Sequence, residues 1–205
     1  MSLNKAVRWM SPMLLVLTTI PFGAALAADE APAGVRGEIL AGIKDAEDKL
    51  NQLAEATPEA KYSYRPSKES RSAGQVFMHV AAGNYFLASF AGTKPPEGMN
   101  LEKYEDSLSK KADIQKALKD SFAHVEKALM SASDADLEKP VDFFGRKTTV
   151  RGAYMLVLSH AHEHLGQSIA YARGNGLVPP WTAAQEAAAK EAANKKAEGA
   201  KGQKK

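Results

Sequence analysis

Three of the five histidines in this 205-residue chain stand close together, at positions 160, 162 and 164. On an α-helix, residues four apart lie on the same face, with Cβ atoms about 6 Å apart. His160 and His164 have this spacing, so both imidazoles can reach one metal ion, as paired helical ligands do in zinc sites. His162 is out of phase with them. We expect it to pack beside Leu158 and Leu165, in the core or in a subunit interface.

A pair of histidines at this spacing is weak support for a metal site, because helices carry such pairs by chance and buried histidines are common. His79 lies on an apolar stripe of another predicted helix, near small residues such as Gly83 that would let a second helix approach. An imidazole buried there needs a polar partner. His124 stands between Asp120 and Lys127, on a face that we expect to be solvated. His79 is therefore the natural third ligand.

Four segments have the helical periodicity needed to position these residues, at about 35–56, 72–92, 113–130 and 149–173. The first carries Val35, Ile39, Ile43, Leu50 and Leu53 on one face, and the third carries Ile114, Leu118, Phe122, Val125 and Leu129. Ser72 is expected to cap the second helix. Gly174-Asn175-Gly176 should end the fourth, and Pro179-Pro180 should prevent its continuation.

Two connections complete the expected fold. The segment between the second and third helices is too long for a tight antiparallel turn, so we expect a crossover that leaves these two helices parallel. The residues around Gly145 alternate like a small hairpin before the fourth helix. The chain is therefore predicted to be all-α, a four-helix bundle with a long crossover between helices 2 and 3.

The N-terminal 27 residues are typical of a signal peptide. Lys5 and Arg8 precede an apolar run that is short for a membrane span, and Ala25 and Ala27 have the small-residue spacing of a cleavage site. We expect cleavage after Ala27 and a periplasmic or secreted protein without stable membrane insertion. The alternative is an uncleaved N-terminal anchor. Residues 28–181 would then form the bundle, and 182–205 an Ala/Lys-rich flexible tail.

Composition narrows the chemistry further. The chain has no cysteine, which excludes disulfides, thiol nucleophiles and thiolate ligands. Its 27 basic and 24 acidic residues do not cluster into a basic face, so we expect no nucleic-acid partner. Any site must therefore use histidine, carboxylate or hydroxyl groups, or a bound cofactor.

Two stretches resemble a known family. "ESRSAGQVFMHVAAGNYFLASFAG" and "LSHAHEHLGQSIAYARGNGLVPP" are similar to the second and fourth helices of the DinB family, the DinB/YfiT-like metalloenzymes. The resemblance spans roughly residues 35–181, and it implies His79, His160 and His164 as ligands of a divalent metal, Zn or Ni. Leu165 stands where many members have Arg, and the predicted signal peptide departs from a mostly cytoplasmic family.

Three functions remain open from the sequence. The first is a metal-dependent hydrolase or small-thiol transferase acting on a small molecule, with Glu163 as a candidate catalytic base because it follows His160 by three residues. The second is a periplasmic protein that binds metal without catalysis. The third is an interaction protein whose fourth helix pairs with a partner protein or, in a homodimer, with a second copy of itself. Because thiol cosubstrates are mainly cytosolic, the predicted export disfavours thiol transfer.

Overall fold

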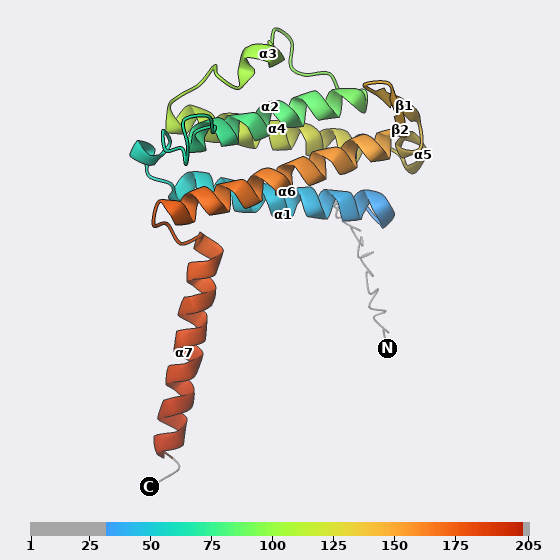
Figure 1. Ribbon diagram of the computed structural model, residues 1–205. Helices are drawn as coiled ribbons and strands as arrows, with labels where there is room; N and C mark the ends of the chain where they lie inside the picture. The colour runs from blue at the N-terminus through green and yellow to red at the C-terminus, as the bar shows by residue number, and fades with distance from the viewer. Residues whose placement is uncertain (1–31, 203–205) are drawn as a thin grey trace, which may run out of the picture. The chain divides into compact units, whose positions relative to one another are not determined.

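The computed structural model describes residues 32–202, so the predicted signal peptide, residues 1–27, lies outside the described residues. Four long helices form the bundle: α1 (Gly34–Ala56), α2 (Ala73–Phe90), α4 (Lys111–Ser131) and α6 (Val150–Gly174). Shorter elements connect them: η1 (Glu59–Lys61), α3 (Leu101–Tyr104), α5 (Asp134–Leu137) and the strands β1 (Pro140–Phe143) and β2 (Arg146–Thr149). A further helix, α7 (Pro180–Gly202), follows. The predicted all-α four-helix bundle is confirmed (Figure 1).

The four long helices form a closed ring of neighbours. α2 packs against α4 and α6, and α1 packs against the same two helices. Figure 1 shows that α2 and α4 run in the same direction, because the chain between them passes back along the bundle through α3. The predicted crossover is therefore confirmed. It matters for the site, because it carries residues 91–110 over α2.

The predicted apolar faces form the core. Ile39, Ile43, Leu50 and Leu53 of α1 are buried, as are Ile114, Leu118, Phe122, Val125 and Leu129 of α4. Val35 is the exception, since it lies in the first turn of α1 and is 44% exposed. Each fully buried aliphatic or aromatic side chain contributes about 1.5–3 kcal/mol from its removal from water. This contribution holds the four helices in fixed positions relative to one another.

The hairpin leads into α6 without a linking residue. β1 and β2 pair antiparallel, with Pro140 opposite Thr149, and α6 begins at Val150. Thr149 also caps α6, because its Oγ1 accepts a hydrogen bond from the Gly152 N–H at 3.2 Å. The predicted hairpin before the last helix of the bundle is thus confirmed.

The C-terminal region is helical, since residues 182–202 lie within α7; the flexibility expected of residues 182–205 stays a prediction. α6 ends at Gly174, where the expected cap follows, with Gly176 at φ +76°. Pro180 begins α7, where its missing N–H costs no hydrogen bond. The Ala, Gln, Glu and Lys residues that follow have high helix propensity, and the side chains of residues 183–196 are all exposed. Neither α7 nor any other helix within residues 32–202 is long and apolar enough to cross a membrane.

Candidate metal centre

Three histidines from two helices that are distant in sequence meet between α2 and α6. His79 lies on α2, and His160 and His164 lie one turn apart on α6. Each offers one ring nitrogen, and these nitrogens all lie within 4.8 Å of one another. The Nε2 atoms of His79 and His160 are 3.3 Å apart. The sequence prediction that these three residues come together is therefore confirmed.

Gly83 makes this approach possible. A Cβ atom at position 83 would lie 2.2 Å from Cε1 and 2.8 Å from Nδ1 of His160, which is closer than real Cβ atoms come to other heavy atoms. The His160 ring therefore occupies the space that a side chain on α2 would fill. The expectation that small residues here admit another helix is confirmed, and the group admitted is an imidazole.

His79 is held by a residue of the crossover. Its Nδ1 lies 2.8 Å from Oε2 of Glu105, just after α3. Glu105 also forms an ion pair with Arg71, whose Nη2 donates to Oε2 at 3.3 Å. Burial raises the pKa of Glu105, but the hydrogen bonds from Arg71 and His79 outweigh it and leave the pKa below its usual value. The ionised carboxylate accepts from Nδ1–H of His79, so Nε2 of this ring keeps its lone pair.

His164 is held from within its own helix. Its Nδ1 lies 2.8 Å from Oε1 of Gln167, and Nε2 of Gln167 donates to the Tyr171 hydroxyl at 3.0 Å. The bond to Tyr171 orients the amide, so its oxygen accepts from Nδ1–H of His164. Nε2 of His164 therefore also keeps its lone pair. Gln167 and Tyr171 thus continue the face of α6 that carries His160 and His164.

His160 has no such partner, since its Nδ1 is buried without a hydrogen bond. Burial is the main cause that lowers the pKa of His160, to about 4, with smaller contributions from His164, His79 and Arg71. Burial also lowers the pKa of His164, although the hydrogen bond to Gln167 opposes the change. Both rings are therefore neutral at pH 7, which is the state in which imidazole binds metals.

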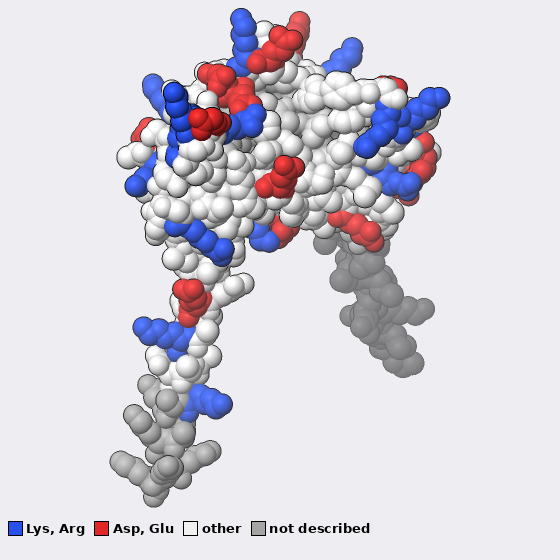
Figure 2. Space-filling view, viewed as in Figure 1, with Lys and Arg blue, Asp and Glu red and all other residues white. Residues whose placement is uncertain are grey.

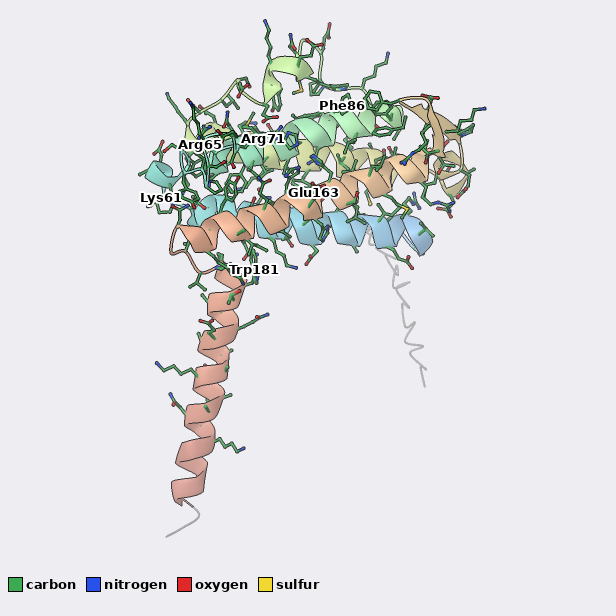
Figure 3. The ribbon with its side chains drawn as sticks, in the orientation of Figure 1. Lys61, Arg65, Arg71, Phe86, Glu163 and Trp181 are labelled. Atoms are coloured by element: carbon green, nitrogen blue, oxygen red, sulfur yellow. The ribbon has the colours of Figure 1, made fainter. Side chains whose placement is uncertain are left out.

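The other candidate residues lie outside this group. Glu163 is exposed in the middle of α6 (Figure 3) and acts on His164 only through its charge, which raises the pKa of that ring. A catalytic role for Glu163 stays a prediction. His162 is exposed as well, its Nδ1 donates to the Leu158 carbonyl at 3.1 Å, and its Nε2 lies 3.7 Å from Oδ2 of Asp45. Packing of His162 in the core was therefore a wrong expectation, and the subunit interface stays untested.

His124 corrects a second expectation, that of a solvated surface histidine. The ring lies 5.0 Å from that of Tyr85, and its Nε2 is buried without a hydrogen-bond partner. Burial lowers the pKa of His124. Its charged neighbours Asp120 and Lys127 suggested an exposed ring. Tyr85 of α2 covers the His124 ring on α4 instead, and a contact between two helices cannot be read from the residues next to His124 in sequence.

A pocket of about 460 Å³ opens on one side of the histidines. Its lining is mostly apolar and comprises His79, Ala82, Gly83, Phe86, Leu87, Leu101, Glu102, Glu105 and His160. Sequence reasoning missed the residues that the crossover contributes to this wall, because the connection has no periodicity to indicate that it folds back over α2. The arrangement therefore has three converging imidazoles and an open side.

Comparisons with known proteins agree with this architecture. The family model of the DinB superfamily matches residues 43–168. The uncharacterized protein YjoA of Bacillus subtilis (strain 168) is 26% identical over 132 residues, which cover 62% of this chain and 81% of YjoA. The crystal structure of a DinB-like protein from Bacillus cereus ATCC 10987 has a TM-score of 0.61 at 20% identity and covers 69% of this chain and 93% of its own. This likeness shows the shared fold.

The structure of YfiT from Bacillus subtilis is also similar. It is described as "a probable metal-dependent hydrolase with an unusual four-helix bundle topology". Its TM-score is 0.57 at 13% identity, and the match covers 70% of this chain and 89% of YfiT. At this identity the likeness shows the fold and does not transfer the activity.

Proposed function

The chain belongs to the DinB superfamily, and from this premise we propose that it binds one divalent metal ion through His79, His160 and His164. One observation carries the proposal: three ring nitrogens converge within 4.8 Å, and the Nδ1–H groups of His79 and His164 donate hydrogen bonds to Glu105 and Gln167, which directs the other nitrogen of each ring inward. Zn or Ni is the expected metal, because both suit imidazole ligands.

The donor set fits such an ion. Zinc binds imidazole nitrogen at about 2.0–2.1 Å, which places two tetrahedral ligands roughly 3.3 Å apart. The Nε2 atoms of His79 and His160 have a separation of 3.3 Å. A hydrogen bond between these two rings also gives this distance, but it does not explain why the ring of His164 meets them at the same place. A cation shared by the rings accounts for their common orientation.

The chain's own residues prepare the site for catalysis. When bound, a divalent ion with an open coordination position acts as a Lewis acid and lowers the pKa of a coordinated group. Glu105 and Gln167 each accept a hydrogen bond from Nδ1–H, of His79 and of His164 respectively, and so hold each ring in one tautomer. The pocket beside His79 and His160 offers space for a small molecule. We therefore propose a metal-dependent hydrolase, with small-thiol transfer as the related alternative.

We also propose that the protein is exported from the cytoplasm. A signal peptide cleaved after Ala27 would release the mature protein into the periplasm or beyond it, where thiol cosubstrates are scarce, and this favours hydrolysis over thiol transfer. A non-catalytic metal-binding protein is the second candidate. It is supported by the exposed position of Glu163, the residue proposed as catalytic base, which makes no hydrogen bond to the histidines among the described residues. Homodimer formation through α6 remains part of the interaction hypothesis.

Metal analysis of protein extracted from the periplasm tests the site. We expect one Zn or Ni ion per chain in the natural sequence and loss of the ion in His160→Ala. His162→Ala is the matched control, because it removes an exposed imidazole from the same helix and should keep the metal. Wild-type protein without stoichiometric divalent metal would refute the proposal.

Catalysis needs a separate test. A screen of ester, amide and thiol-transfer substrates should give an activity that chelation removes and re-addition of the metal restores. Metal-loaded protein that turns over nothing in such a screen would favour the non-catalytic candidate.

A further inference from the structure

The wall of the pocket continues along α2 away from the histidines. His79, Gly83, Phe86 and Phe90 follow one another at spacings of four, three and four residues, so they share one face of the helix. Phe86 lines the pocket and is 38% exposed. Its ring centroid lies 5.2 Å from that of Phe90. An apolar surface therefore begins beside the imidazoles and extends toward the end of α2.

The hairpin extends this surface. The Phe90 ring lies 4.7 Å from that of Phe143, and the Phe86 ring lies 6.0 Å from that of Phe144. We call Phe86, Phe90, Phe143 and Phe144 the aromatic track. In Figure 3, Phe86 lies on α2 between the middle of the bundle and the hairpin end. The aromatic track thus connects the pocket with the outer surface of the molecule.

Phe144 is an unusual residue for its position. It has φ +52° in the turn of the hairpin, a left-handed conformation that bulky side chains rarely adopt, and it is 75% exposed. Asn or Asp would suit this turn better and would avoid an exposed aromatic ring. A strained, exposed phenylalanine that contacts the pocket wall points to an apolar binding partner.

The charges around the pocket restrict this partner. Glu102 and Glu105 are the charged side chains that line it, and both are acidic. Arg71, the nearby cation that contacts the site, is already paired with Glu105. Figure 2 shows charged side chains over the crossover and at the hairpin end, with uncharged surface between them. A ligand with a carboxylate or phosphate in its body would therefore meet negative charge without a free cation.

We propose that the site takes a small molecule with a metal-binding head and an uncharged apolar body, an aryl group or an alkyl chain, that lies along the aromatic track. This inference rests on the proposed metal site for the head of the ligand, and on the track alone for its body. The pocket volume of about 460 Å³ lies in the range of sites for small organic ligands.

Three hydroxamates with the same metal-binding head test the inference by calorimetric titration of the Zn-loaded protein. Acetohydroxamate is the head alone, octanohydroxamate adds an alkyl chain, and suberic monohydroxamate has a chain of the same length that ends in a carboxylate. We expect octanohydroxamate to bind at least about tenfold more tightly than either of the others, because only its chain is buried without charge. Equal affinities for the two long compounds would overturn the proposal.

Two variants test whether the alkyl chain of octanohydroxamate lies along the aromatic track. Phe86→Ser and Phe144→Ser should each reduce the advantage of octanohydroxamate over acetohydroxamate, by at least about threefold for Phe86. In Phe144→Ser, affinity for acetohydroxamate should stay within about twofold of wild type, because Phe144 does not line the pocket beside the histidines. Val178→Ser is the control, because Val178 is a 49% exposed apolar residue outside the track. An advantage that survives in both Phe variants would also overturn the proposal.

The same comparison on metal-free protein separates this inference from the metal site. If the protein takes up no metal but still prefers the uncharged chain, and Phe86→Ser removes the preference, the metal proposal fails and the apolar site stands. If metal and acetohydroxamate bind but the long chains do not differ, the metal proposal stands and the apolar site fails.

Discussion

Two helix interfaces of this bundle bury polar side chains, and they do so differently. Between α2 and α6, His79 donates a hydrogen bond to Glu105 and His164 donates one to Gln167, and these bonds fix the two rings. Between α1 and α4, Glu47 lies beside Glu126, and an oxygen of Glu126 is buried without a partner. Burial, followed by the hydrogen bond and charge of Glu126, raises the pKa of Glu47 to about 8.

The difference supports the proposal that the interface between α2 and α6 holds a metal ion. A proton shared between Glu47 and Glu126 is enough to remove the repulsion between the two carboxylates. Lys44 also forms a partly exposed ion pair with Glu126 at 3.6 Å. Burial lowers the pKa of His160 and His164, so these two rings are already neutral at pH 7. Further residues nevertheless orient the rings of His79 and His164 toward a common point. We therefore expect substitutions between α2 and α6 to abolish or weaken metal binding, and a substitution of Glu47 to affect stability only.

The largest effect is expected from Gly83→Ala. The new Cβ would collide with the His160 ring, so the ligand must leave its position or the helices must separate. We expect Zn affinity to fall more than about 100-fold, which exceeds the loss typical of removing a residue that hydrogen-bonds to a metal ligand. We also expect the free energy of unfolding to fall by about 1–3 kcal/mol, measured by urea denaturation.

Gly166→Ala is the matched control for this change. Gly166 also lies in a long helix, but a Cβ there meets nothing within 4 Å. Its replacement should leave Zn affinity unchanged and raise stability by about 0.5–1 kcal/mol through the lower backbone entropy of alanine. Equal Zn affinities for the two alanine variants would contradict the close approach described for His160.

The next effect is expected from Glu105→Gln. The amide is a weaker acceptor for Nδ1–H of His79 and loses the ion pair with Arg71, so we expect Zn affinity to fall about 10–100-fold. Competition titration with a chromogenic chelator measures this change. Glu102→Gln, which neutralises a neighbouring carboxylate of the same pocket, should change affinity by less than about threefold. A similar loss in both variants would mean that overall negative charge, and not orientation of His79, supports the metal.

The smallest effect is expected from Glu47→Gln and depends on pH. The pKa of Glu47 is raised to about 8 in the folded protein from 4.5, so the folded state binds this proton more tightly than the unfolded state. The stability that the group contributes is fully present below pH 4.5 and is lost as pH rises through 8. Glu47→Gln should therefore match wild type at pH 5 and exceed it at pH 8.5. We expect a gain of about 1–2 kcal/mol, allowing for solvent screening of this half-buried side chain.

Urea denaturation at the two pH values checks this prediction. Asp48→Asn removes a carboxylate from the exposed position next in sequence, so it should give a much smaller difference between the two pH values. A Glu47→Gln variant whose advantage over wild type is the same at pH 5 and pH 8.5 would exclude the shared proton.

Helical periodicity made much of this molecule predictable. The spacing of His160 and His164, the small residues around His79 and the buried stripes of α1 and α4 are local properties of single helices, and the structure confirms them. Glu105 was not predictable in this way, since its contact with His79 depends on how an irregular crossover folds back over α2. His124 was assigned wrongly because Tyr85, which covers it, belongs to another helix.

The direct passage from β2 into α6 has a consequence for the angle at which the ligands face α2. Each residue turns an α-helix by about 100°, and no loop separates Thr149, paired in the hairpin, from Val150. The hairpin therefore fixes the rotational phase of α6 from its first residue. One residue inserted between Thr149 and Val150 would turn His160 and His164 together by about 100° relative to His79. The small sheet thus acts as an angular reference for the two proposed ligands, His160 and His164, which lie at least ten residues further along the chain.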